Sequence, residues 1–138
     1  TRPWRGDRLA VVLPAGHPLA GEPELALAQT LAYEHVSLPP ESAVQVMLQR
    51  AAALAGQPIR YRGVTATFDA ALRVVRAGLA IAVLPVELAT PFADAFGLTI
   101  TPLTDAWAER RFALFCRDEA LLPPAARLLM AHLERSAE

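Results

Sequence analysis

The segment from residue 64 to residue 86, VTATFDAALRVVRAGLAIAVLPV, constrains the fold more than any other part of the chain. It contains a helix start at Thr67, whose hydroxyl can accept a hydrogen bond from an amide in the first turn. Asp69 follows where the positive end of the helix dipole favours an anion. Apolar residues then recur at helical spacing, at Phe68, Ala71, Leu72 and Val75. The pattern predicts a short amphipathic helix directly after a strand.

A glycine and an apolar run complete this segment. Gly78 can adopt the left-handed conformation that ends a helix. Leu79 to Leu84 is apolar without alternation, which is typical of a strand covered on both sides in a parallel sheet, and Pro85 ends it. The segment is therefore predicted to be a β-α-β unit. Ligands of open α/β sheets bind beyond the carboxyl ends of the strands, next to helix N-termini, so we expect a ligand there.

A second helix start lies upstream at Ser42. Gln45 follows at the spacing of a capping box. The helix is predicted to continue with an apolar stripe to Gly56, and Gln45, Gln49 and Arg50 are expected to lie off that stripe. Ser42 either caps the helix only, or it also receives an anionic or polar ligand together with nearby amides. The residues alone leave both interpretations open.

The remaining elements alternate along the chain. Strands are predicted at 7–13, 35–38, 59–64, 98–103 and 111–116, and helices near 26–32, from about Pro91 to 96, and from Pro123 onward. Pro91 suits the first turn of its helix. This order of elements is typical of an α/β fold.

Composition excludes several classes of protein. The chain has 138 residues, enough for one domain with a core, and a net charge of −1, which argues against a surface that grips DNA. The single Cys116 is expected to pack in the core and fits a reducing, cytoplasmic setting. The longest apolar run is too short to cross a bilayer. The opening TRPWRGDR is expected to lie inside a longer protein.

Motifs for catalysis and metal binding are absent from the sequence. There is no glycine-rich phosphate loop, no nucleophile motif and no pair of Cys or His residues at zinc spacing. His17, between Gly16 and Pro18, is predicted to be a structural turn residue. A binding module is therefore favoured over an enzyme, and neither a cofactor nor a metal is expected.

Several stretches together resemble the C-terminal effector-binding domain of LysR-type transcriptional regulators. They are DRLAVVLPAGHPLAG, LPPESAVQVMLQRAAALAG, TATFDAALRVVRAGLAIAVLP, LTITPL and WAERRFALFCRD. The order and spacing match over nearly the whole chain. The resemblance implies a type 2 periplasmic-binding-protein-like fold, with two α/β lobes joined by crossover strands around a ligand cleft.

The resemblance also implies boundaries within this chain. Residues from about 20 to 105 are expected to form lobe two, residues 7–14 and 111–117 the crossover strands, and residues 123–136 the closing helix of lobe one. The first part of lobe one and an N-terminal helix-turn-helix, which binds DNA in the family, are expected in the parent protein rather than in this chain.

Ligand contacts of the family map onto three places in this sequence. They imply a ligand-binding set of Pro40, Glu41, Ser42, Ala43, Thr65, Thr67, Phe68 and Pro85. Many family ligands are carboxylates, and Glu41 would repel them, so either the effector is not anionic or Glu41 points to water. For Thr67 and Phe68, roles as cap and core remain alternatives to ligand contact.

Three functions are compatible with these sequence features. The resemblance favours a sensor that binds a small-molecule effector, such as a carboxylate or another small metabolite, and modulates DNA binding by a regulator dimer or tetramer. A fragment of a periplasmic solute-binding protein is the main alternative, and a small α/β enzyme is the third. Association is expected to involve the apolar sides of Phe112, Leu114 and the closing helix.

Overall fold

The computed structural model describes residues 2–114, 128–129 and 131–133. The chain divides into two compact units, one comprising Arg8–Ala108 and the other Thr1–Asp7 with Glu109–Glu138. Among the described helices, none combines the length and the apolar character that a bilayer crossing requires.

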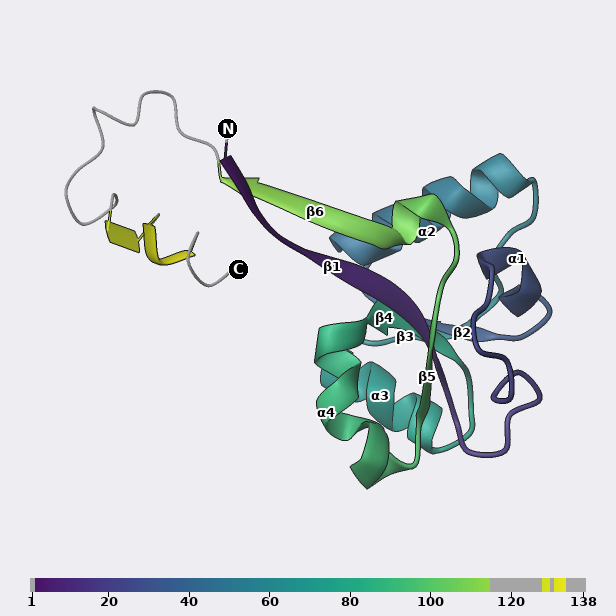
Figure 1. The fold of residues 1–138 in the computed structure, drawn as a ribbon. Coiled ribbons are helices and arrows are strands. Elements are labelled where there is room, and N and C mark those ends of the chain that lie inside the picture. Colours follow the sequence, from purple (N-terminus) through teal and green to yellow (C-terminus); the bar gives the residue numbers. More distant parts are fainter. Residues whose placement is uncertain (1, 115–127, 130, 134–138) are drawn as a thin grey trace. The chain divides into compact units, whose positions relative to one another are not determined.

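Strands and helices alternate as predicted, which confirms the α/β class (Figure 1). The strands are β1 (Arg2–Leu13), β2 (His35–Ser37), β3 (Tyr61–Val64), β4 (Ala82–Pro85), β5 (Thr99–Pro102) and β6 (Glu109–Leu114). The helices are α1 (Leu27–Thr30), α2 (Ala43–Ala55), α3 (Phe68–Arg76), α4 (Val86–Phe96) and the 3-10 helix η1 (Ala106–Ala108). Residues 128–129 and 131–133 are also helical, whereas Cys116 and the expected helix start at Pro123 lie outside the described residues.

In the unit Arg8–Ala108, β1 lies between β4 and β5. β1 pairs antiparallel with both β4 and β5, so that Val11 lies opposite Val83 on one side and Thr101 on the other. β2 and β3 pair in parallel. An isolated parallel bridge between His35 and Ile81 joins the two groups of strands, and the Val36 amide donates to the Ile81 carbonyl at 2.8 Å. The strands therefore follow the order β3-β2-β4-β1-β5.

The sheet around β4 is mixed, and the expectation of a parallel sheet was wrong. Ala80 to Pro85 are buried, as predicted for a strand covered on both sides. However, β4 takes its main pairing from antiparallel β1, and only Ile81 makes a parallel bridge. An uninterrupted apolar run reports burial on both sides and carries no information on the direction of the neighbouring strand.

The strand order also explains where the helices lie. The chain leaves β2 through α2 to reach β3, and returns past β2 through α3 to reach β4. Right-handed crossovers that run in opposite directions place their helices on opposite sides of the sheet. Figure 1 shows α3 and α4 together on one side of these strands and α2 on the other. The predicted apolar side of α3 is confirmed, since Ala71, Leu72 and Val75 are buried.

Helix α4 begins earlier than predicted. It starts at Val86, directly after Pro85, and Pro91 lies inside it rather than in its first turn. The helix packs against α3, β4 and β5, and Ala89 is fully buried. This packing favours a helical backbone from Val86 onward despite the amide that Pro91 lacks. The position of a proline in the sequence says nothing about this packing, so the start of α4 could not be predicted from it.

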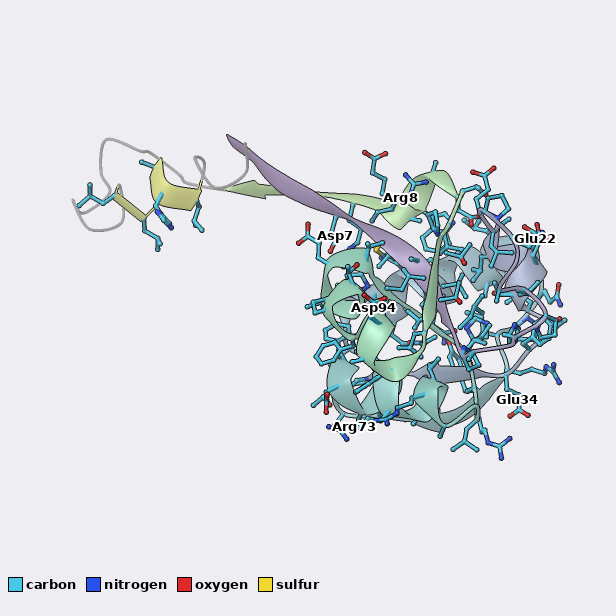
Figure 2. The ribbon with its side chains drawn as sticks, turned by 60° about the horizontal axis from the view of Figure 1, so that its bottom comes forward. Asp7, Arg8, Glu22, Glu34, Arg73 and Asp94 are labelled. Atoms are coloured by element: carbon cyan, nitrogen blue, oxygen red, sulfur yellow. The ribbon has the colours of Figure 1, made fainter. Side chains whose placement is uncertain are left out.

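In the other unit, β6 pairs with β1. Arg110 Nε donates to Asp7 Oδ1 at 2.6 Å, and a second guanidinium nitrogen donates to Asp7 Oδ2. Both side chains are largely buried, and Asp7 is labelled on β1 in Figure 2. The expected strand 111–116 is confirmed for its described part, 111–114.

Candidate ligand-binding site

The start of α2 has the predicted cap. Ser42 has an extended backbone, and its hydroxyl oxygen accepts from the Gln45 amide at 3.1 Å. The Ser42 amide in turn donates to the Pro39 carbonyl at 2.9 Å. These two bonds fix the turn between the end of β2 and the first turn of α2. The amides of Ala43 and Val44 have no intrahelical acceptor, because they belong to the first turn.

The start of α3 is built in the same way. The Thr67 hydroxyl oxygen accepts from the Ala70 amide at 3.1 Å, which confirms the predicted N-cap. Asp69 in the first turn accepts from Arg73 Nε at 3.0 Å, and both side chains are more than half exposed. Figure 2 shows Arg73 on the outer side of α3. The amides of Phe68 and Asp69 also lack an intrahelical acceptor.

One pocket of about 200 Å³ lies between these two helix starts. It is lined by Leu38, Pro39, Glu41, Ser42, Ala66, Thr67 and Phe68. The loops after β2 and β3 therefore bring Ser42 and Thr67 to the same end of the sheet. The positive ends of both helix dipoles add there, and the site favours an anionic or hydrogen-bond-accepting group.

The two walls of this pocket are joined behind it. The Ser37 carbonyl accepts from the Thr65 amide at 2.8 Å and from the Thr65 hydroxyl at 3.2 Å. The Ser37 hydroxyl donates to the Leu38 carbonyl at 2.6 Å. These bonds connect the end of β2 to the end of β3, so the strands that lead to the two helix starts are hydrogen-bonded to each other.

Half of the predicted ligand-binding residues line this pocket. Glu41, Ser42, Thr67 and Phe68 are among its lining residues, and the exposed Glu41 side chain lies at its rim. The other predicted residues, Pro40, Ala43, Thr65 and Pro85, do not line it. Thr65 lines a separate hollow of about 240 Å³ with residues that include Val64 and Val74, and Pro85 is buried at the start of α4.

Sequence reasoning missed three lining residues, Leu38, Pro39 and Ala66. They belong to no motif, and only their position next to the two caps could have indicated them. The position of Gln45 also differs from the prediction, which placed it off the apolar stripe of α2. Its side chain is buried, with 2% exposed. Hydrogen bonds at both ends of its amide make this burial tolerable.

A larger hollow of about 310 Å³ lies at the opposite ends of β2 and β3 and contains none of the predicted residues. Its lining includes His17, Glu34 and Arg60. The Arg60 guanidinium donates to the Ala32 carbonyl, and the Glu34 carboxylate lies 3.9 Å from Arg62. Because these charges already have partners, this hollow is the weaker candidate. Within the described residues, no cluster of three side chains suited to a metal ion occurs.

A protein-family model matches the whole chain. It is the model of the LysR substrate binding domain, and it covers residues 1–138. The chain belongs to this family. The family has a type 2 periplasmic-binding-protein-like fold, which confirms the fold class expected from the sequence. No curated protein sequence matches the chain significantly.

Solved effector-binding domains of LysR regulators share the fold. The regulatory domain of Synechocystis PCC6803 CcmR in complex with 2-PG has a TM-score of 0.85 at 18% identity. The effector-binding domain of QuiR in complex with shikimate has a TM-score of 0.80 at 16% identity. The BenM effector-binding domain with benzoate has a TM-score of 0.69 at 21% identity.

Coverage is unequal between the chain and these structures. Each alignment covers 99% of this chain, but only 66% of the CcmR domain and 64% of the QuiR and BenM domains. The chain therefore spans just under two thirds of the length of these structures. At these sequence identities, the similarity establishes a shared fold and not a shared ligand.

Proposed function

We propose that this chain is the ligand-sensing part of a LysR-type transcriptional regulator. In this proposal, a small-molecule effector binds at the pocket between Ser42 and Thr67. Residues from about 20 to 105 then correspond to lobe two of a two-lobed domain, and the stretches 7–14 and 111–117, which include parts of β1 and β6, correspond to its crossover strands. The single observation that carries the proposal is the convergence of two capped helix starts on one pocket in a chain that belongs to this family.

The chemistry of the pocket supports an effector with an acceptor group. Ser42 and Thr67 supply hydroxyls, and the first-turn amides of two helices supply donors that no intrahelical acceptor satisfies. Phe68 and Leu38 add apolar surface. A small metabolite with a carboxylate and an apolar or ring portion fits this combination. Shikimate and benzoate, which occupy the QuiR and BenM domains, are both of this kind.

Glu41 is the one lining residue that opposes an anion. Its side chain is exposed at the rim, where water and salt screen its charge. The positive ends of two helix dipoles, by contrast, both favour an anion in this pocket. We therefore retain the carboxylate class and assign Glu41 to the solvent side of the site.

Effector binding would regulate transcription by shifting the populations of regulator conformations. DNA binding belongs to a helix-turn-helix domain outside this chain, and the net charge of −1 fits that division of roles. A regulator of transcription acts in the cytoplasm and needs no catalytic group in its sensor. The family match does not favour the alternative of a periplasmic solute-binding protein.

A negative charge at Ser42, the N-cap of α2, tests ligand binding in this pocket and keeps the helix capped. Asp is as good an N-cap as Ser, so Ser42→Asp should leave the free energy of unfolding within about 0.5 kcal/mol of the parent. The new carboxylate should weaken binding of benzoate or shikimate by at least about tenfold, because two like charges a few ångströms apart in a partly buried pocket repel by more than about 1.4 kcal/mol. Isothermal titration calorimetry against a panel of small carboxylates measures the loss.

Thr104→Asp is the matched control, since Thr104 is exposed and does not line the pocket. A panel member that binds the parent should bind this variant equally well. Equal affinity for the parent and Ser42→Asp would rule out this pocket. If no carboxylate of the panel binds the two-lobed domain of the full regulator, the carboxylate class is wrong.

A further inference from the structure

Gln45 is a buried polar side chain next to the proposed site. It lies in the first turn of α2 and is 2% exposed. Its Oε1 accepts from the Leu38 amide at 3.3 Å, and its Nε2 donates to the Tyr61 hydroxyl. A buried side-chain amide costs free energy unless both of its ends are hydrogen-bonded. Both ends of Gln45 have partners.

The two partners belong to the two walls of the pocket. Leu38 lines the pocket directly, on the loop that leads to the α2 cap. Tyr61 is the first residue of β3, the strand that runs into Ala66 and Thr67 on the other wall. Gln45 thus bridges the segment before one helix start and the strand before the other.

The Tyr61 phenol is suited to this role. It is half-buried, and burial raises the pKa of Tyr61, although the hydrogen bond from Gln45 opposes that shift. The phenol therefore stays protonated at neutral pH and offers a neutral oxygen to Gln45 Nε2. Gln49, one turn along α2, also donates to the Tyr61 hydroxyl, but at 3.4 Å and from an exposed position, where water can replace the bond.

We propose that Gln45 is a positioning residue that sets the separation of the two walls of the pocket between Ser42 and Thr67. The proposal rests on the proposed function, because it gives that pocket its shape. The Leu38 carbonyl already accepts from the Ser37 hydroxyl, and the Leu38 amide, the other backbone polar group of this residue, donates to Gln45 Oε1. An apolar side chain could fill the volume of Gln45 but could not hold the Leu38 amide.

Amide hydrogen exchange on the unliganded 138-residue chain tests this role. Gln45→Met keeps the size of the side chain and removes both bonds, so exchange at the Leu38 amide should accelerate by about threefold to tenfold, the worth of one hydrogen bond. Amides in the core of α3, such as those of Leu72 and Val75, should keep their rates. Gln49→Met is the matched control and should leave all of these rates unchanged.

Two exchange results would overturn the proposal. One is an unchanged rate at Leu38 in Gln45→Met. The other is an equal acceleration at Leu38 and Leu72, which indicates a loss of global stability only. If Gln45→Met does not fold, Tyr61→Phe removes the hydroxyl alone. This variant should also accelerate exchange at the Leu38 amide, by a smaller factor than Gln45→Met. An unchanged rate in this variant also overturns the proposal.

A binding measurement links this role to the site. Benzoate and shikimate serve as probes, and the one that binds the parent should bind Gln45→Met at least about threefold more weakly, with Gln49→Met unchanged. Equal affinities for parent and Gln45→Met would refute positioning while leaving the Ser42→Asp result intact. If neither probe binds the unsubstituted chain, a carboxylate of the wider panel that does bind takes their place, and the exchange rates decide the role of Gln45 independently.

Discussion

His35 illustrates how one buried side chain makes the fold sensitive to pH. The ring is 1% exposed, and its Nε2 lies 3.2 Å from the Thr30 carbonyl. Burial lowers the pKa of His35 from 6.5 to about 4, and the hydrogen bond to the Thr30 backbone only partly opposes this shift. The ring is therefore neutral at pH 7, with the Nε2 proton donated to the carbonyl.

This shift predicts a loss of stability in mild acid. Below pH 6.5 the unfolded chain gains a proton on His35, whereas the folded chain does not until about pH 4. The free energy of unfolding should therefore be unaffected by His35 above pH 6.5. It should fall by about 2 to 3 kcal/mol between pH 6.5 and 4.5. Urea unfolding across this range measures the change.

A variant separates His35 from the carboxylates that titrate in the same range. His35→Gln should show a distinctly smaller loss on acidification, although it is less stable at pH 7.5. His17→Gln is the control, because His17 is more exposed and burial lowers its pKa without producing a large shift. An acid loss in His35→Gln as large as in the parent would contradict the assignment.

At the scale of elements, α4 carries the clearest departure from the sequence pattern. Pro91 is exposed inside the helix, and it removes one backbone donor from the helical ladder. Pro91→Ala should raise the free energy of unfolding by about 1 to 2 kcal/mol, since the restored hydrogen bond outweighs the greater entropy of the unfolded chain. Thermal and urea unfolding measure the gain.

Pro18→Ala in the exposed loop after β1 is the control and should give no gain. A loss of stability in Pro91→Ala would instead favour the shorter helix that the sequence pattern placed from Pro91 to Phe96. The comparison thus tests the start of α4 as well as its energetics.

At the scale of the whole molecule, we expect the chain to associate as a dimer. The helical residues Leu128 and Leu129 are 72% and 59% exposed, and adjacent exposed leucines promote association. Light scattering at high concentration should give a dimeric mass. The double variant Leu128→Ser with Leu129→Ser should shift the mass toward the monomer, because it removes apolar surface from the contact.

Leu54→Ser serves as the control, since Leu54 is 91% exposed at the end of α2. A monomeric mass for the parent would contradict the dimer. Dissociation by Leu54→Ser and not by the double variant would place the interface on α2 instead.

Local chemistry made most of the elements predictable. Ser42 and Thr67 cap their helices through hydroxyls that reach amides three residues ahead, and such bonds depend only on adjacent residues. Gly56 ends α2 in a left-handed conformation for the same local reason. The family resemblance added the fold class, and the family match confirms it.

The remaining features depend on contacts between residues distant in sequence. The sequence by itself determined where helices begin, which of their sides are apolar and which family the chain belongs to. Only the tertiary structure decided that β4 pairs antiparallel with β1, that Pro91 is enclosed in α4, and that Gln45 is buried. The direction of strand pairing, the position of Pro91 inside a helix and the burial of a polar side chain all depend on contacts with other elements. No local pattern of residues encodes those contacts.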